Sequence, residues 1–132
     1  MTQRMPIHGR EEAAVQILAD GRVLDGTLVR PAEARGLVIF AHGSGSSRFS
    51  PRNRFVAQQL NQAGFATLLF DLLTAEEEAS EALTRHLRFD IPLLSRRLVA
   101  ATDQAHSWPA TSGLALGYFG ASTGAAAALS AA

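Results

Sequence analysis

The chain has 132 residues, 47% of them hydrophobic, and its twelve arginines balance its twelve aspartates and glutamates. This composition suits one compact domain and excludes a disordered chain. The net charge of zero gives no reason to expect nucleic acid or a membrane as a partner. The chain has no cysteine, which excludes disulfides, a thiol nucleophile and thiolate metal sites. No segment has the pattern of a signal peptide or the length of a membrane span, so we expect a soluble, cytoplasmic protein.

The first predicted elements are two strands within residues 13–31. They are joined by Asp20 and Gly21, a dipeptide that tolerates positive φ and is typical of a tight hairpin turn. We therefore expect an antiparallel hairpin at the start of the sheet. The residues before it, 1–12, are expected to be a flexible N-terminus.

A continuous apolar run, residues 37–41, predicts the next strand, buried on both faces. Ser50 followed by Pro51 is typical of a helix N-cap with proline in the first helical position, and Gly64 marks the end of that helix. The residues that recur at helical spacing in it are Phe55, Val56, Leu60 and Ala63.

The second half of the chain continues to alternate strands and helices. Residues 65–73 predict a buried strand, and Thr74 with Glu77 has the spacing of a capping box for a short helix whose glutamates face solvent. Asp90 is the expected cap of a further helix, and residues 113–120 predict the last strand. The core-facing residues of that further helix are Ile91, Leu94, Leu98, Ala101 and Ala105.

Strands and helices in this order predict the α/β class, with a mostly parallel sheet, an antiparallel N-terminal hairpin and helices on both faces. No repeat or linker divides residues 1–132, so we expect a single domain. The four histidines show no metal-ligand spacing, and we expect neither a metal nor a cofactor.

The last predicted strand runs into the sequence GASTG, residues 120–124. A G-x-S-x-G pattern between a strand and a helix is typical of a nucleophile elbow, where Gly120 and Gly124 leave room for a sharp turn around Ser122. We therefore expect Ser122 to be the catalytic nucleophile and the backbone N–H of Thr123 to be one oxyanion donor. The alternative is that the glycines permit close packing and Ser122 only caps the helix.

The loop after the strand at residues 37–41 reads HGSGSS. We expect its backbone to supply the second oxyanion donor, from Ser44 or else from Gly45, with His42 and Gly43 shaping the loop. The same loop suggests a phosphate-binding alternative, since Gly43 and Gly45 match the first two glycines of G-x-G-x-x-G. Arg48 stands where the third glycine belongs, and the chain has no lysine for a P-loop.

Together, the segments LVIFAHGSGSS and GYFGASTGAAAAL resemble the α/β-hydrolase superfamily, in particular its dienelactone-hydrolase-like branch, from Val15 onward. The resemblance implies hydrolysis of an ester or related acyl bond through an acyl-enzyme at Ser122, with a small-molecule substrate. Dienelactone hydrolases proper carry cysteine at the elbow, so Ser122 favours a more general esterase activity.

In that family the acid and the histidine of the triad follow the serine on later strands, so we expect them beyond residue 132. Residues 1–132 are accordingly expected to form an incomplete domain, inactive or nearly so, that is completed by a C-terminal segment or second chain or else pairs with itself at the open sheet edge. A noncatalytic fragment is a further alternative.

An unorthodox triad within the chain is a less favoured hypothesis. It would draw on His8, His86, His106, Asp71 and Asp90. The arginines near the HGSGSS loop could bind a substrate anion, but a solvated helix start explains them more simply. They are Arg48, Arg52 and Arg54.

Overall fold

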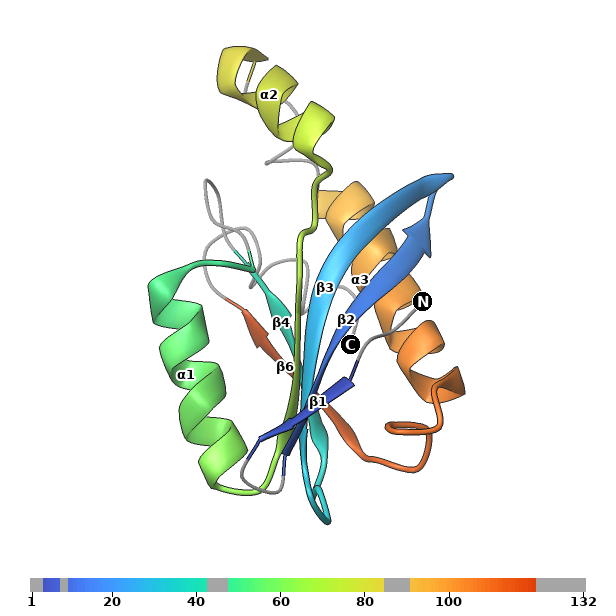
Figure 1. The fold of residues 1–132 in the computed structure, drawn as a ribbon. Coiled ribbons are helices and arrows are strands. Elements are labelled where there is room, and N and C mark those ends of the chain that lie inside the picture. The colour runs from blue at the N-terminus through green and yellow to red at the C-terminus, as the bar shows by residue number, and fades with distance from the viewer. Residues whose placement is uncertain (1–3, 8–9, 43–47, 85–90, 121–132) are drawn as a thin grey trace.

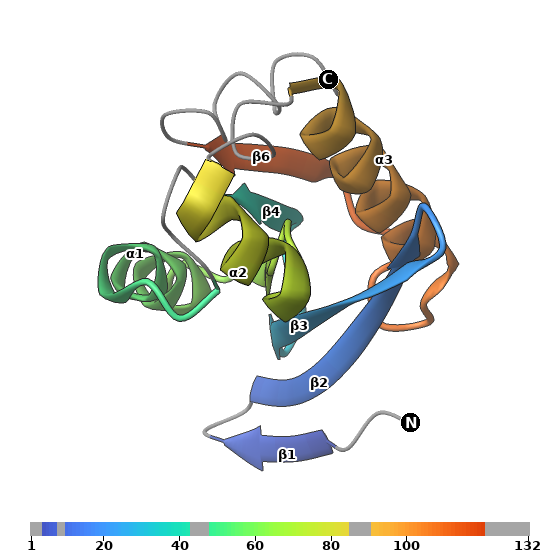
Figure 2. The same ribbon diagram turned by 90° about the horizontal axis from the view of Figure 1, so that it is seen from above.

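The structure is a computed structural model that describes residues 4–7, 10–42, 48–84 and 91–120. It is a twisted mixed sheet with helices on both faces, as Figures 1 and 2 show. Among the described residues, no helix is both long enough and apolar enough to cross a membrane.

The sheet has six strands in the order β1-β2-β3-β5-β4-β6. Their bounds are Arg4–Ile7 (β1), Arg10–Ala19 (β2), Arg22–Pro31 (β3), Leu37–Ala41 (β4), Ala66–Phe70 (β5) and Leu116–Gly120 (β6). β4 pairs in parallel with both β5 and β6, whereas β1, β2 and β3 pair antiparallel and β3 meets β5 antiparallel. The predicted α/β fold with an antiparallel start is confirmed.

The start of the chain differs from the expectation of a flexible terminus over residues 1–12. β1 lies in this range and pairs along its length with the first residues of β2, from Ile7 opposite Arg10 to Arg4 opposite Ala13. An edge strand of this kind is held by backbone hydrogen bonds. Because these bonds do not require alternating apolar side chains, the sequence of this segment does not indicate a strand.

The predicted turn between β2 and β3 is present, because Asp20 and Gly21 both have positive φ, 52° and 71°. Both residues therefore adopt the left-handed conformation that a two-residue hairpin of this type requires. Glu33, between β3 and β4, also has a positive φ of 53°, which the sequence did not indicate.

Two long helices cover the two faces of the sheet, α1 (Pro51–Gln62) on one and α3 (Ile91–Ser107) on the other, as Figure 2 shows. The Ser50 hydroxyl accepts a hydrogen bond from the Asn53 backbone N–H at 3.4 Å, and Gly64 has a φ of +95° just after α1. Both predicted ends of α1 are confirmed. The predicted cap of α3, Asp90, lies outside the described residues.

The larger core lies between the sheet and α3, and a smaller one lies under α1 around Phe40, Ala57 and Leu69. Phe55, expected at a recurring core spacing, is 61% exposed. The buried face of α1 instead includes Asn61, whose side-chain amide donates to the Phe65 carbonyl at 2.9 Å and to Thr67 Oγ1 at 3.1 Å. These hydrogen bonds compensate the burial of a polar residue, and apolar periodicity cannot reveal them.

A short helix, α2 (Ala75–Thr84), extends beyond the carboxyl ends of the parallel strands (Figure 1). Its predicted capping box is present: the Thr74 N–H donates to Glu77 Oε1 at 2.9 Å and the Glu77 N–H donates to Thr74 Oγ1 at 3.1 Å. Glu77 does not face solvent as expected. It pairs with Arg97 of α3, which is 2% exposed and donates to the two carboxylate oxygens at 2.5 and 2.8 Å.

Arg97 also donates to the Leu72 carbonyl at 2.8 Å, so one side chain joins α2, α3 and the segment after β5. Its hydrogen bonds lower the pKa of Glu77 from 4.5 to about 2, although partial burial of the carboxylate acts in the opposite direction. The charged form of Glu77 is therefore part of the folded structure.

Acid should destabilise the protein partly through Glu77. Because its pKa is lower in the folded chain, its contribution is complete above about pH 4.5 and is lost as the pH falls toward 2. A shift of this size corresponds to at most about 3 kcal/mol. We expect Glu77→Gln to be less stable at neutral pH and to show a shallower loss of stability on acidification, measured by denaturant unfolding across pH. Glu76→Gln, exposed on the same helix, is the control; equal pH dependence of Glu77→Gln and wild type would contradict this.

Candidate active site

The candidate site lies where the parallel strands β4, β5 and β6 end, toward the top of Figure 1. The last residues of β4 and β6, Ala41 and Gly120, are register partners on adjacent strands. Adjacent strands lie about 4.8 Å apart, so the chain leaves the sheet at two neighbouring points of one edge. The segments that follow are the two that the sequence analysis singled out.

Only part of the predicted site falls within the described residues. His42 and Gly120 are described. The predicted nucleophile, both oxyanion positions and the remaining elbow and loop residues lie outside them: Gly43, Ser44, Gly45, Ser122, Thr123 and Gly124. Their roles therefore stay predictions.

The strand that precedes Ser122 is held on both faces. The Phe119 ring packs against Phe40 with ring centroids 5.1 Å apart, on the side of α1. On the other face the Tyr118 hydroxyl shares a 2.7 Å hydrogen bond with Thr102 Oγ1 of α3. β6 thus reaches the candidate site as a fixed strand.

His42 follows β4 directly and is 6% exposed. Its Nε2 accepts a hydrogen bond of 2.8 Å from the backbone N–H of Leu72, the second residue after β5. An acceptor nitrogen carries no proton, so this contact requires Nε2 to be unprotonated. The buried Leu72 N–H thereby gains a partner, and the start of the 42–47 loop is tied to the neighbouring strand end.

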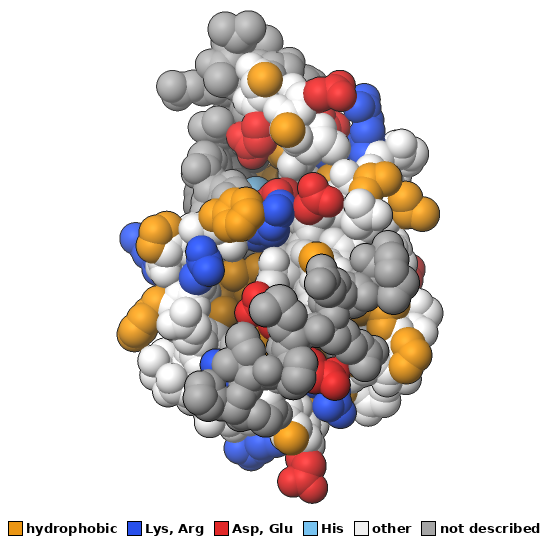
Figure 3. Space-filling view, viewed as in Figure 1, with side chains coloured by type: hydrophobic (Ala, Val, Ile, Leu, Met, Phe, Trp, Pro, Cys, Tyr) orange, Lys and Arg blue, Asp and Glu red, His pale blue; other side chains and the backbone are white. Residues whose placement is uncertain are grey.

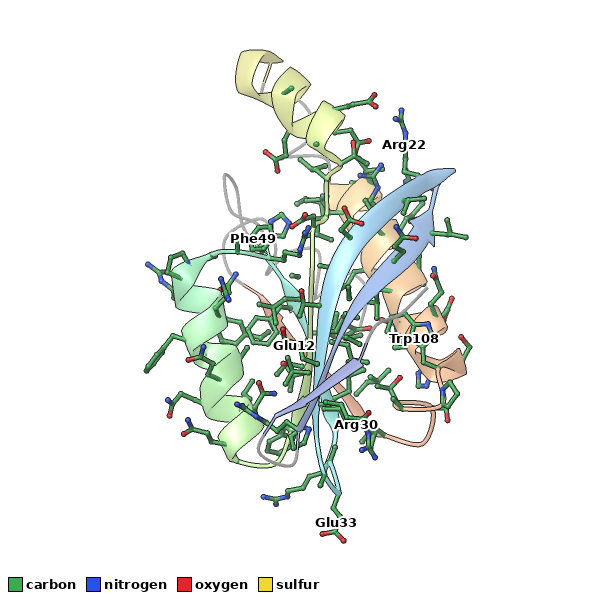
Figure 4. The ribbon with its side chains drawn as sticks, in the orientation of Figure 1. Glu12, Arg22, Arg30, Glu33, Phe49 and Trp108 are labelled. Carbon is green, nitrogen blue, oxygen red and sulfur yellow. The ribbon has the colours of Figure 1, made fainter. Side chains whose placement is uncertain are left out.

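Arg48 and Asp71 form a second connection between the same two segments. The Arg48 backbone N–H donates to Asp71 Oδ1 at 2.9 Å, and the Arg48 guanidinium donates to Oδ2. The guanidinium carbon also lies 4.2 Å from the centroid of the Phe49 ring, which Figure 4 labels beside α1. Arg48 was expected to be a solvated residue at the helix start; its side chain is 19% exposed and ion-paired. The partners are 23 residues apart, and no local pattern indicates their contact.

Arg48 lines two cavities, each of about 260 Å³. One lies between α1 and the sheet and also has Arg54 and Glu12 in its wall; the other lies beside α2, against Asp71 and Glu78. Basic and acidic side chains both surround the hollows on this face (Figure 3). Because acidic side chains line both cavities, neither has the purely positive lining expected of an anion-binding site.

The unorthodox triad finds no support among the described residues. His106 is exposed near the end of α3, and the chain enters β6 shortly afterwards, so His106 lies at the amino ends of the parallel strands. Asp71 lies at their carboxyl ends. His8, His86 and Asp90 lie outside the described residues. Within the described ranges, no three histidine or carboxylate side chains are grouped as metal ligands would be.

No protein-family model matches the chain. Over 118 residues it is 56% identical to two Mycobacterium tuberculosis proteins, of strains CDC 1551 and H37Rv, each named "Putative phosphoribosyl transferase". This match includes 89% of the chain but only 26% of those proteins, so the chain spans about a quarter of the length of its curated relatives.

Solved structures of hydrolases share the fold. A dienelactone hydrolase from Anabaena variabilis matches 95% of this chain with a TM-score of 0.91 and 60% identity, and the chain spans 58% of that protein. A cold-adapted esterase from an Arctic intertidal metagenomic library matches 98% of the chain with a TM-score of 0.75 at 17% identity, over 58% of its own length.

Replacing His42 with phenylalanine should lower the free energy of unfolding. The variant keeps a ring of similar size but leaves the buried Leu72 N–H without its acceptor, at a cost of about 1–3 kcal/mol. Denaturant unfolding measures the change, and His106→Phe, at an exposed position, is the matched control. A His42→Phe variant as stable as wild type would show that this hydrogen bond contributes nothing.

Proposed function

We propose that this chain, which has the α/β fold of dienelactone hydrolase and related esterases, forms the nucleophile-bearing part of a serine hydrolase acting on an ester or related acyl bond. The observation that carries the proposal is the pairing of Ala41 with Gly120. It starts the glycine-rich loop and the G-x-S-x-G segment at adjacent points of the sheet edge. An oxyanion hole assembled from two loops needs this proximity.

In the proposed reaction, Ser122 Oγ attacks the acyl carbonyl carbon and a histidine takes the hydroxyl proton. The negative charge that develops on the carbonyl oxygen is stabilised by the backbone N–H of Thr123 and by that of Ser44, with Gly45 as the alternative donor. The histidine returns the proton to the leaving group as the acyl-oxygen bond breaks. A water molecule then attacks the acyl carbon and gives a proton to the histidine. The histidine passes this proton to Ser122 Oγ as the bond between the acyl carbon and Oγ breaks, which releases the carboxylic acid.

We propose that the acid and the histidine come from chain after residue 132 or from a second chain. In folds of this type the nucleophile precedes both partners in the sequence. Of the histidines that the structure describes, His42 has its Nε2 in a hydrogen bond with backbone, and His106 lies at the opposite end of the strands. We therefore propose neither of them as the base for Ser122.

The name of the curated relatives concerns proteins much longer than this chain. The matched 118 residues make up 26% of each relative's length. By contrast, the matched part of the chain makes up 58% of the dienelactone hydrolase, so the relatives are roughly twice as long as the hydrolase. We propose that phosphoribosyl transfer, if those relatives perform it, belongs to the part of them that this chain does not match.

Nucleotide or phosphate binding at the 42–47 loop is the competing function. It predicts that nucleotides raise the melting temperature of the protein and that this effect depends on the loop. The hydrolase proposal predicts no such shift, and covalent capture by acyl or phosphonate reagents instead. A thermal-shift series with nucleotides therefore separates the two functions.

Ser122→Ala should abolish both fluorophosphonate labelling and turnover of short-chain p-nitrophenyl esters in the intact protein. Both require attack by the serine oxygen, and a triad that has lost one member keeps only residual catalysis. Mass spectrometry of the labelled protein locates the adduct. Ser112→Ala, at an exposed serine before β6, should change neither result. Labelling that persists in Ser122→Ala would refute the assignment.

The open edge of β6 gives a separate test of how the sheet is completed. Among the described strands, β6 has β4 as its one neighbour, and its residues are half-buried and largely apolar. An unpaired apolar edge favours association with another strand. We expect residues 1–132 alone to self-associate at micromolar concentration in light scattering, whereas in the longer polypeptide the β6 amides are protected from hydrogen exchange. A monomer of residues 1–132 with protected β6 amides would contradict this expectation.

A further inference from the structure

A further cavity, of about 160 Å³, lies between β2, β3 and the segment that follows α3. Arg30 in its wall comes directly after Val29 of β3, which pairs with Thr67 near the start of β5. The candidate active site lies where β5 ends. The cavity is therefore near the amino ends of the parallel strands and separate from the candidate active site.

Much of the wall of this cavity is apolar. Ala13 and Val15 of β2 and Leu28 of β3 line it and belong to the core under α3. Trp108 and Pro109, directly after α3, line its other side. An apolar cavity of about 150 Å³ holds a benzene molecule. The volume here accordingly suits a compact apolar group about as large as the leucine side chain.

One acidic and one basic side chain complete the wall. Glu11 of β2 and Arg30 of β3 are register partners, so their Cα atoms lie about 5 Å apart. Side chains alternate along a strand, and the core residues Ala13 and Leu28 are each two positions away, so both charged residues are on the α3 face. Within the described ranges no ion pair joins the two. Opposite charges therefore lie side by side in the wall without neutralising each other directly.

Arg30 is held in place and still has donors for a ligand. Its Nε donates to the Ala110 carbonyl at 2.7 Å, and its Nη1 donates to the Pro31 carbonyl at 3.5 Å. A guanidinium has five N–H groups in one plane, and these two bonds use fewer than half of them. No other described residue supplies an acceptor. A half-buried guanidinium of this kind can bind a carboxylate through two parallel hydrogen bonds.

We propose that this cavity binds a free α-amino acid with an apolar side chain of about the size of leucine. The ligand carboxylate accepts hydrogen bonds from Arg30, the ammonium group donates to Glu11, and the side chain lies against Trp108. Glu11 also takes part in another interaction, which does not prevent this role because the two oxygens of a carboxylate accept several hydrogen bonds.

The charge of the wall selects this class of ligand. A ligand with one positive and one negative group matches a wall with one of each, whereas a simple anion would be repelled by Glu11 and a simple cation by Arg30. The inference is independent of the proposed function.

Trp108 gives a direct readout, because it is the single tryptophan of residues 1–132. The intact protein is labelled with fluorotryptophan, and the fluorine resonance that Trp108→Phe removes is assigned to Trp108. We expect L-leucine to shift this resonance saturably, with a Kd of about 0.1–1 mM for a ligand of about nine non-hydrogen atoms. Glycine, which has no side chain to bury, should bind at least about tenfold more weakly.

Two leucine analogues test the two charges on the wild-type protein. Isocaproate lacks only the ammonium group of leucine, and isopentylamine lacks only its carboxylate. Each should bind at least about tenfold more weakly than leucine, because one charge of the wall then has no ligand group. This comparison needs no variant, so it remains decisive where a substitution prevents folding.

Two variants assign the charges to residues. Arg30→Gln should weaken leucine binding at least about tenfold and should not weaken isopentylamine, whereas Glu11→Gln should weaken leucine and should not weaken isocaproate. The controls are Arg22→Gln, at an exposed position of β3, and Glu12→Gln, on the opposite face of β2 (Figure 4). Both should bind leucine as the wild type does. Denaturant unfolding of each variant confirms that the fold is populated.

Three outcomes would overturn the proposal. The first is the absence of a saturable Trp108 shift with leucine at about 10 mM, ten times the weakest expected Kd. The second is isocaproate binding as tight as leucine binding, which would make the cavity a carboxylate site without a role for Glu11. The third is an unchanged leucine affinity in folded Arg30→Gln. None of these outcomes affects the proposed hydrolase function.

Discussion

The structure depends on the parallel pairing of β4 with strands on both of its sides. Of the described strands β4 alone has two parallel neighbours, β5 and β6. Because side chains alternate along a strand, Ile39 enters the core under α3 while Phe40 enters the smaller core under α1. The two cores on opposite faces of the sheet therefore both include residues of this strand, and the candidate site begins where the strand ends.

The sequence predicts those parts of the fold that local physics determines. Asp20 and Gly21, Ser50 before Pro51, and the pair Thr74 and Glu77 each act within a few residues of chain, and the structure shows the predicted turn, cap and capping box at these positions. Contacts between distant segments leave no such pattern. The ion pair of Arg97 with Glu77 spans 20 residues, and no spacing rule indicates it.

The same distinction applies to the candidate site. The predicted elbow around Ser122 and the HGSGSS loop can be singled out from the sequence because each is a compact motif next to a predicted strand. That they start side by side follows from the strand order, which places β6 next to β4 although α1, β5, α2 and α3 lie between them in the chain. The anchoring of the loop ends by Asp71 and Leu72 requires the order of all three strands, and so only the structure reveals it.

The burial of Arg97 also limits how the protein can change over generations. If Glu77 were lost first, the guanidinium would remain under α2 with Asp20, 3.9 Å from its Nε, as the nearest carboxylate. Removing one partner of a buried ion pair typically costs about 3–5 kcal/mol, a large share of the stability of a small domain. Replacing both partners by apolar residues of similar volume can be neutral. The effect of a substitution at Arg97 therefore depends on the residue at position 77, and the reverse also holds. Both residues can be replaced one after the other only when an earlier substitution elsewhere has already raised the stability of the protein.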